Sequence, residues 1–330
     1  MGEFELIDRF FLRRGRPASA RVPLGVGDDC ALLAPSPGHQ LAVSSDMLLE
    51  GRHFLSTADP ERLGHKALAV NLSDLAACGA RPLAFTLALA LPAADEQWLG
   101  AFSRGLFALA DAHGCELAGG DTTRGPLAIC ITVFGEVPQG QALLRSGAKA
   151  GDEVWVSGAV GDARLALEVF RGSVSLPSAL FEAARERMER PTPRVALGQA
   201  LRGIATAAID ISDGLLGDLG HLLRGSGAGA TLDTRAALEL LAVRTQAVGS
   251  EGLPDAQLQL DCVLSGGDDY ELAFTAAPTQ RAAVEAAAVQ AGTRVSRIGL
   301  IEEGSALRVI DARGEPVQRR FAGFDHFRPA

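Results

Sequence analysis

Five short segments of the chain combine carboxylates with small or hydroxyl-bearing residues. They are GDD at 27–29, SSD at 44–46, NLSD at 71–74, GGDTT at 119–123 and DISDG at 210–214. Carboxylate and hydroxyl oxygens beside tight backbone turns are ligands that hard cations such as Mg²⁺ accept. A single cluster of this kind is more often a helix cap or a solvated turn. Five in one chain favour a metal-rich site.

Two residues of the third cluster can act together. Asn71 and Asp74 lie three positions apart in a predicted helix, so their side chains share one face of that helix. Asn71 is also the only asparagine in the chain. This spacing makes the pair a candidate for one side of a polar site.

A magnesium site of this kind implies a phosphate-bearing ligand, because Mg²⁺ usually bridges a few carboxylates to substrate phosphates. The known phosphate-binding loops are missing: the sequence has no GxxxxGK[ST], no GxGxxG after a strand and no kinase HRD or DFG motif. Phosphates must then be held by metal ions and by backbone N–H groups. The glycine pairs Gly119-Gly120 and Gly266-Gly267 suit that role, because a residue without Cβ lets an anion approach the peptide closely.

Other classes of chemistry have weaker support. The sequence has no GxSxG motif, and its six histidines are scattered, although a catalytic triad can assemble across sequence distance. The five cysteines form no CxxC pair, which favours reduced thiols over a zinc site or a disulfide framework. A non-catalytic metal-binding module also fits the carboxylates and stays open as an alternative.

Composition limits the partners of the chain. Forty acidic and 31 basic residues give a net charge of −9, which disfavours nonspecific binding to nucleic acid. No uncharged stretch reaches the eighteen or so apolar residues that span a membrane. The N-terminus shows no basic segment followed by an apolar one, so we expect a cytoplasmic protein with no membrane or nucleic-acid partner.

The elements that must position these residues follow from hydrophobic periodicity. In the first half we expect strands at 41–45, 83–91 and 127–137 and helices at 60–79 and 95–114. The pattern lapses between 140 and 152 into glycine, glutamine, serine and lysine, which indicates a domain boundary.

A second unit follows that boundary. We expect strands at 153–157, 206–209, 295–301 and 307–310, and helices at 162–171, 179–190, 194–202 and 279–291. With 330 residues, the chain is more than twice the commonest domain size. The expected fold class is α+β, a mixed α/β protein with domains at 1–148 and 149–330.

Taken in order, the motifs resemble a known family. The motifs are GVGDDCA, SSDMLLEGRHF, NLSDLAACGARP, GGDTTRG, LLRSGAKAGD, DISDGL, SGGDDYEL and GFDHF. Together they resemble the thiamine-monophosphate kinase family, a branch of the aminoimidazole-ribonucleotide-synthetase-like, or PurM-like, ATP-binding superfamily. The resemblance extends from Gly25 to Phe327.

The resemblance implies a two-domain PurM-like fold whose N-terminal sheet domains pair in a homodimer, with ATP bound between domains. It implies transfer of the γ-phosphoryl group of ATP to thiamine phosphate, the final step of thiamine diphosphate synthesis. The acceptor is a phosphate with a second pKa near about 6, so no strong general base is needed. Mg²⁺ would neutralise the repulsion between acceptor and triphosphate and support direct in-line transfer.

The resemblance also implies roles for individual residues. The implied metal ligands, or neighbours of ligands, are Asp28, Asp29, Ser45, Asp46, Asp74, Asp121, Asp210 and Asp213. The implied ATP contacts are Gly120, Asp121, Arg145 and Ser212. The implied thiamine phosphate contacts are His53, Asp268 and Phe324.

Some of these roles have a chemical reason. Arg145 would offer a bidentate fork to the triphosphate. Phe324 and Asp268 would offer a ring face and a carboxylate to the cationic, aromatic thiamine. The family usually has glutamate where this chain has Asp268, so the reach of that carboxylate is one methylene shorter.

Related enzymes of the superfamily remain alternatives on fold alone. A selenophosphate synthetase needs a reactive cysteine or selenocysteine and a lysine near its N-terminus, and the region before Gly25 has neither. An aminoimidazole-ribonucleotide synthetase shares the fold. A carbamoyl-dehydrating maturation factor would end in a reactive cysteine, whereas this chain ends Phe-Arg-Pro-Ala.

Overall fold

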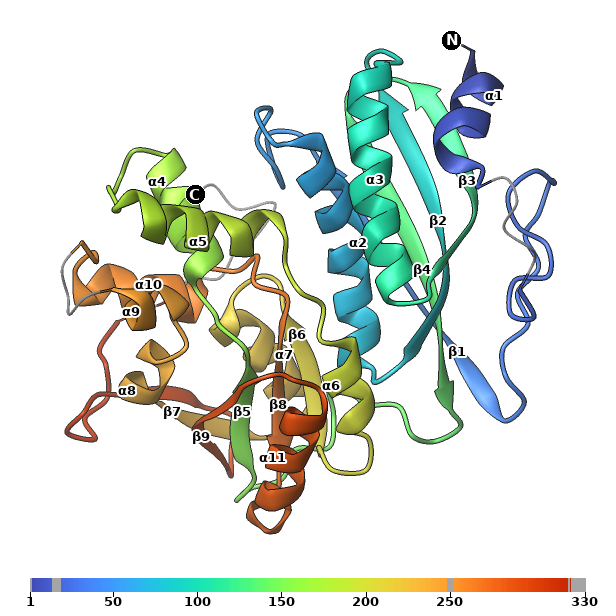
Figure 1. Ribbon diagram of the computed structural model, residues 1–330. Helices are drawn as coiled ribbons and strands as arrows, with labels where there is room; N and C mark the ends of the chain where they lie inside the picture. Colours follow the sequence, from blue (N-terminus) through green and yellow to red (C-terminus); the bar gives the residue numbers. More distant parts are fainter. Residues whose placement is uncertain (1, 14–18, 248–251, 320, 322–330) are drawn as a thin grey trace. The chain divides into compact units, whose positions relative to one another are not determined.

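The computed structural model describes residues 2–13, 19–247, 252–319 and 321 (Figure 1). These residues form two compact units. Unit 1 consists of Met1–Leu75 and Ala80–Ala142, and unit 2 of Ala76–Gly79 and Leu143–Ala330. The mixed α/β fold class is confirmed, with one sheet in each unit.

Unit 1 is built on a four-stranded sheet in the order β1-β4-β2-β3. Its strands are β1 (His39–Leu49), β2 (Arg81–Leu91), β3 (Glu116–Arg124) and β4 (Ala128–Pro138). β4 pairs antiparallel with both β1 and β2, whereas β2 and β3 are parallel. β1 and β3 are therefore the two edge strands.

The helices of unit 1 are α2 (Pro60–Ala77), α3 (Glu96–Ala112) and the short α1 (Glu3–Leu6), which continues into a helical segment at Ile7–Phe11. α2 and α3 approach closely, because a Cβ on Gly64 would meet the Phe102 carbonyl oxygen. Asp95 caps α3 by accepting hydrogen bonds from the N–H groups of Gln97 and Trp98. Leu68, Leu72, Phe85 and Phe102 are fully buried.

Unit 2 is built on a six-stranded sheet in the order β10-β7-β9-β5-β8-β6. Its strands are β5 (Glu153–Ser157), β6 (Ala207–Ile211), β7 (Gly229–Asp233), β8 (Glu271–Ala276), β9 (Val295–Glu302) and β10 (Leu307–Ile310). Only the β10–β7 pair is parallel. Every residue of β5, β6 and β8 is buried.

The helices of unit 2 are α4 (Asp162–Phe170), α5 (Ser178–Glu189), α6 (Val195–Ala200), α7 (Leu215–Ser226), α8 (Thr234–Leu238), α9 (Ala242–Gln246), α10 (Ala256–Ser265) and α11 (Arg281–Gln290). A short turn, Pro278–Gln280, leads into α11. The most important helix for the site is α7. It begins after Gly214 and ends at Gly227, and both glycines have positive φ angles, of 117° and 65°.

The structure confirms the predicted helix around 71–74, which lies in α2, and the predicted strand at 41–45, which β1 extends through 44–46. The sequence prediction missed the strand at 119–123, which lies in β3. The small and polar residues of 119–123 are typical of a turn, but parallel pairing with β2 keeps this segment extended. Gly120 permits that pairing, because its φ is 151° and a Cβ there would lie 1.9 Å from the Leu87 carbonyl oxygen.

Candidate functional site

In unit 1, two candidate metal ligands lie where β1 faces α2. The Ser44 hydroxyl donates a hydrogen bond to Asp74 Oδ2 at 2.5 Å. Asn71 accepts the backbone N–H of Asp46 at 3.1 Å and donates its own Nδ2–H to the Ala67 carbonyl at 3.0 Å. Asn71 and Asp74 thus both contact β1 from one face of α2. The structure brings Asp46 and Asp74 to the same strand–helix junction.

Ser45 does not join that junction. Its hydroxyl bonds to Thr132 Oγ1 at 2.9 Å and to the Ile131 carbonyl at 3.3 Å, both on β4. Successive side chains of a strand point to opposite faces, so the Ser45 side chain and its two neighbours lie on opposite sides of the sheet. A metal contact through the Ser45 hydroxyl is therefore separate from the junction of Asp46 and Asp74.

The other candidates of unit 1 lie apart from this junction. Asp28 and Asp29 are exposed on the loop before β1, where Asp28 Oδ1 accepts the Asp29 N–H at 2.8 Å. Gly120 and Asp121 lie on β3, at the edge of the sheet opposite β1. Three interstrand spacings, about 14 Å, separate these edges. Within unit 1 the candidates thus form separate groups.

His53 follows β1 in a tight turn. Its Nδ1 accepts the backbone N–H of Leu49 at 3.0 Å, and the N–H of Gly51 donates to the Phe54 carbonyl at 2.8 Å. Because Nδ1 is the acceptor, the proton of the neutral ring is on Nε2. The turn therefore fixes the tautomer that can donate a hydrogen bond to an anion.

In unit 2, Asp210 lies near the end of β6, and the loop between β6 and α7 carries Ser212 and Asp213. Asp210 is buried and Asp213 is exposed. The loop is held by Asp218, whose Oδ2 accepts the N–H groups of Ser212 at 3.0 Å, Asp213 at 3.0 Å and Gly214 at 3.2 Å. Burial, and next the charge of Asp213, raises the pKa of Asp218 to about 7.

A second loop, between α10 and β8, is bound to the first one. The N–H of Asp268 donates to the Ser212 carbonyl at 2.7 Å, and the N–H of Tyr270 donates to the Ile211 carbonyl at 2.8 Å. Asp268 and Tyr270 are the only non-glycine residues of the described chain with positive φ, at 67° and 54°. Such conformations concentrate at functional sites. The structure thus brings together Asp268 and Ser212, candidates for two different substrates.

Arg145 is exposed and lies by the C-terminal end of α7. Ser226 Oγ bonds to the Arg145 carbonyl at 3.4 Å, and a Cβ on Gly225 would lie 3.1 Å from that same oxygen. The pKa of His221, on α7, is shifted by the charged groups around this helix. Burial lowers its pKa, the positive charges of Arg224 and Arg145 lower it further, and Asp213 opposes them. Arg145 and Asp213 therefore act on the same imidazole.

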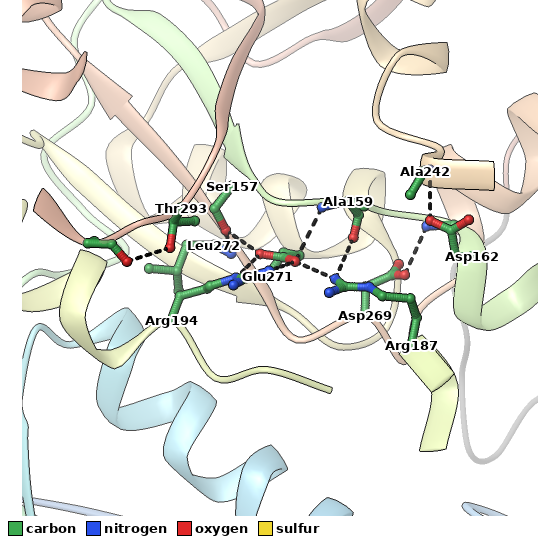
Figure 2. Close-up of polar contacts among 12 residues, drawn as sticks. Ser157, Ala159, Asp162, Arg187, Arg194, Ala242, Asp269, Glu271, Leu272 and Thr293 are labelled. Carbon is green, nitrogen blue, oxygen red and sulfur yellow. Dashed lines mark hydrogen bonds and ion pairs between the residues drawn. The ribbon is translucent and has the colours of Figure 1, made fainter. Parts of the chain in front are cut away.

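Close to the second loop lies a buried ionic network (Figure 2). Glu271 accepts hydrogen bonds from Ser157 Oγ at 2.6 Å and from Arg194 Nε and Nη2, each at 2.6 Å, and it also pairs with Arg187. Since Glu271 is fully buried, these partners are what stabilise its charge. The network anchors the start of β8, directly after the second loop.

Asp269 belongs to the same region. Its Oδ1 accepts the Gly161 N–H at 2.8 Å, whereas its buried Oδ2 has no hydrogen-bond partner among the described residues. Burial raises the pKa of Asp269 well above its usual value, and the charge of Arg187 only partly opposes this. Burial therefore favours the neutral form of Asp269, next to the candidate Asp268.

Sequence reasoning gave no role to Asp218, Ser226 or Asp269. Asp218 had a usable signal, since an acidic residue in the first turn of a helix often accepts backbone N–H groups. Ser226 and Asp269 had none, because their partners lie far away along the chain. Phe324 lies outside the described residues.

The donors that are present suit magnesium. Among the described residues, no three His, Cys, Asp or Glu side chains gather into a complete metal site. Mg²⁺ usually takes one or two carboxylates and completes its shell with water and phosphate oxygens. The pairs Asp46 with Asp74 and Asp210 with Asp213 supply only oxygen donors, in the number that this chemistry uses. The residues therefore fit a magnesium ion shared with a phosphate ligand.

None of the helices in the described segments has the length and hydropathy needed to cross a membrane.

Comparison with known proteins identifies the family. Residues 27–137 match the family described as "AIR synthase related protein, N-terminal domain", and residues 149–312 match its C-terminal domain. The thiamine-monophosphate kinase of Salmonella typhimurium is 45% identical, over 99% of this chain and 98% of that protein. The thiamine-monophosphate kinase of Haemophilus influenzae is 40% identical over the same shares.

Solved structures agree. The crystal structure of thiamine-monophosphate kinase from Stenotrophomonas maltophilia K279a has a TM-score of 0.83 and 46% identity, covering 96% of this chain and 98% of that one. A structure described as "AaThiL complexed with AMPPCP and TMP" has a TM-score of 0.73 and 28% identity, covering 89% of each chain. The predicted resemblance is confirmed, and the chain belongs to the thiamine-monophosphate kinase family of AIR synthase related proteins.

Proposed function

We propose that this chain transfers the γ-phosphoryl group of ATP to thiamine phosphate and releases ADP and thiamine diphosphate. The observation that carries the proposal is the 45% identity to a thiamine-monophosphate kinase over nearly the whole of both chains. The structure of AaThiL with AMPPCP and TMP adds support, because AMPPCP is an analogue of ATP. Likeness to the hydrogenase maturation protein HypE, at 21% identity, concerns the fold alone.

The carboxylates are proposed to hold Mg²⁺. Asp46 and Asp74 would act from unit 1 and Asp210 and Asp213 from unit 2, with contributions from Asp28, Asp29, Ser45 and Asp121. When bound, Mg²⁺ neutralises phosphate charge and stabilises the transferred group. The Asp46 backbone N–H donates a hydrogen bond to Asn71 Oδ1, and the Ser44 hydroxyl donates one to Asp74, so both acids are held in place for this role.

The other candidates divide between the two substrates. We assign ATP to Gly120, Asp121, Arg145 and Ser212, and thiamine phosphate to His53, Asp268 and Phe324. Arg145 would place its guanidinium fork on the triphosphate. His53, with its proton fixed on Nε2, would donate a hydrogen bond to the acceptor phosphate. No residue is assigned as a general base, since the acceptor phosphate is largely deprotonated at neutral pH.

The proposal includes a two-domain organisation, with an ATP- and metal-binding domain at 1–148 and a domain with the substrate-contacting tail at 149–330. It also includes a cytoplasmic location, where ATP is made available and where thiols stay reduced. All five cysteines are free, which suits that compartment.

We propose a homodimer that forms through the sheet of unit 1. Leu41, Val43 and Met47 alternate along the edge strand β1 and are 46%, 57% and 54% exposed. Alternating apolar residues on one face of an edge strand favour covering by a second sheet. Sedimentation of the wild type and of Val43→Asp tests this. A dimer that becomes a monomer supports it, and a monomeric wild type contradicts it.

The activity itself is tested by incubating the full chain with ATP, Mg²⁺ and thiamine phosphate and separating the products by chromatography. ADP and thiamine diphosphate should appear in equal amounts, and EDTA should stop the reaction until Mg²⁺ is added back. Unphosphorylated thiamine serves as the control acceptor and should yield neither. Hydrolysis of ATP without thiamine diphosphate would contradict the proposal.

A further inference from the structure

Helix α7 connects the two groups of unit 2 that are proposed to act on phosphate. Its first turn carries Asp218, which binds the loop that follows Asp210 and carries Asp213. Its last residue, Ser226, binds the segment that follows Arg145. Neither residue belongs to the metal ligands or substrate contacts assigned above.

Asp218 gathers an unusual number of bonds on one atom. Three consecutive backbone N–H groups, from Ser212 to Gly214, converge on its Oδ2 within 3.2 Å. Gly214 has a φ of 117°, and a Cβ there would lie 2.9 Å from the Ser265 carbonyl carbon, so the loop turns sharply between two packed segments. Without Asp218 these N–H groups would lose their acceptor, which is costly above all for the buried N–H of Gly214. Asp218 therefore holds the backbone from which the Asp213 side chain projects.

Ser226 plays the same part at the other end. Its Oγ accepts the N–H groups of Gly147 at 3.2 Å and Ala148 at 3.1 Å, and it lies 3.4 Å from the Arg145 carbonyl. Gly225 allows that carbonyl to approach the helix, because any Cβ there would crowd it. The exposed Arg145 side chain thus starts from a backbone that is bound to α7.

We propose that α7 is a rigid spacer that fixes the loop at 212–214 and Arg145 relative to each other, with Asp218 and Ser226 as positioning residues. The helical rise puts about 12 Å between these two anchors. This inference rests on the proposed function, since the loop and Arg145 matter together only if both handle phosphate. It assigns no contact with substrate to Asp218 or Ser226.

Amide hydrogen exchange measured by mass spectrometry on the full chain tests the anchoring without reference to activity. Asp218→Ala should speed exchange in peptides that cover 212–214 and leave those that cover 145–148 unchanged. Ser226→Ala should do the reverse. Asp218→Asn keeps a carbonyl acceptor and should restore much of the protection. Unchanged exchange at 212–214 in Asp218→Ala would overturn the assignment of Asp218.

A matched control separates positioning from stability. Asp162 is equally buried and accepts the N–H groups of Ala242 and Val243 at 2.9 and 3.0 Å, and neither of these residues is a site candidate. Asp162→Ala should lower the melting temperature as Asp218→Ala does, yet keep kcat within about threefold of the wild type. An equal loss of kcat in both variants would show that Asp218 acts through general stability, and would overturn the proposal.

Kinetics should separate the two anchors as well. We expect Asp218→Ala to lower kcat about 100-fold, since several hydrogen bonds are lost. The kcat of Asp218→Asn should be at least about tenfold higher than that of Asp218→Ala. Ser226→Ala should raise the KM for ATP about three- to tenfold with little change in kcat. If wild-type protein makes no thiamine diphosphate, the proposed function fails, while the exchange data still decide the anchoring. If amide exchange speeds up in these variants while kcat and KM stay at their wild-type values, the proposal that α7 is a spacer would be overturned.

Discussion

The two units hold their candidate ligands by different means. In unit 1, Asp46 and Asp74 are part of a strand and a helix, and regular backbone hydrogen bonds fix their positions. In unit 2, Asp210 lies in β6, whereas Asp213 and the proposed substrate contact Asp268 lie in loops. Those loops are held by buried acids, Asp218 and Asp269, whose pKa values burial raises. A ligand on a regular element needs little further support, whereas a ligand on a loop requires polar groups buried behind it.

This difference has an energetic side. Burying an acid without full compensation costs stability, so the acids behind the loops of unit 2 are retained at a stability disadvantage. Unit 1 avoids that cost, since the neutral amide of Asn71 does the equivalent work. Substitutions in the supporting residues should therefore have different consequences in the two units.

The largest effect is expected at Arg145, which lies in unit 2. An arginine that stabilises a transferred phosphoryl group is worth roughly 10³–10⁵ in rate. Arg145→Lys should lower kcat by about 10³, because lysine lacks the planar fork. Steady-state kinetics measures both constants. A raised KM for ATP with normal kcat would mean that Arg145 only binds ATP in the ground state. Normal values of both constants would mean that Arg145 is a linker residue with no role in the reaction.

The metal ligands of unit 2 come next. Asp210→Asn or Asp213→Asn should cut kcat by about 10²–10³, through loss of charge on a bound cation. The melting temperature of Asp213→Asn should stay near that of the wild type, because Asp213 is exposed. Kinetics at several Mg²⁺ concentrations provides the measurement, with Asp311→Asn in an exposed turn as control. Near-normal activity in both variants would contradict the metal assignment.

A smaller effect is expected for the support in unit 1. Asn71→Ala removes one hydrogen bond to the Asp46 backbone, which β1 continues to hold through its pairing with β4. We expect kcat to fall about tenfold, less than in Asp218→Ala. Parallel kinetics of the two variants sharpens the contrast between units. A larger loss in Asn71→Ala than in Asp218→Ala would reverse it.

The smallest effect on activity, and a distinct one on stability, is expected at Asp269. Its folded pKa is raised, so the folded protein keeps a proton that the unfolded chain loses above its pKa of about 3.9. The contribution of Asp269 to the free energy of unfolding is therefore greatest below the unfolded pKa. It declines as the pH rises from there toward the folded pKa. Asp269→Asn mimics the neutral acid and removes this decline.

Urea denaturation of the wild type and Asp269→Asn between pH 4 and pH 7 measures it. The free energy of unfolding of the variant should rise relative to that of the wild type across this range, while kcat stays within about threefold. A difference that does not change with pH would mean that Asp269 is ionised in the folded protein, and the contrast between the two units would lose one of its supports.

Much of the fold could be predicted from the sequence where periodicity is regular. The predicted strands 153–157 and 307–310 match β5 and β10, and the predicted helix 60–79 matches α2 within two residues. β3 was missed because GGDTT lacks apolar alternation, and only its pairing with β2 keeps it extended. α7, β7, α10 and β8 were not predicted either.

The site could be predicted in its residue types but not in its arrangement. Motif resemblance pointed to Asp46, Asp210 and Asp268, but no sequence pattern shows that Asp268 binds the Ser212 carbonyl through its backbone. The sequence also does not show which side chains are buried, so the raised pKa of Asp269 came only from the structure. Contacts between distant loops depend on the whole fold.

The most direct test of the account follows the phosphoryl group itself. Full-length protein is mixed with ATP labelled in its γ-phosphate, thiamine phosphate and Mg²⁺, and the products of a single turnover are separated. The account predicts label in thiamine diphosphate, none in free phosphate and none on the protein. Label that appears in inorganic phosphate or on the chain, with none in thiamine diphosphate, would contradict it.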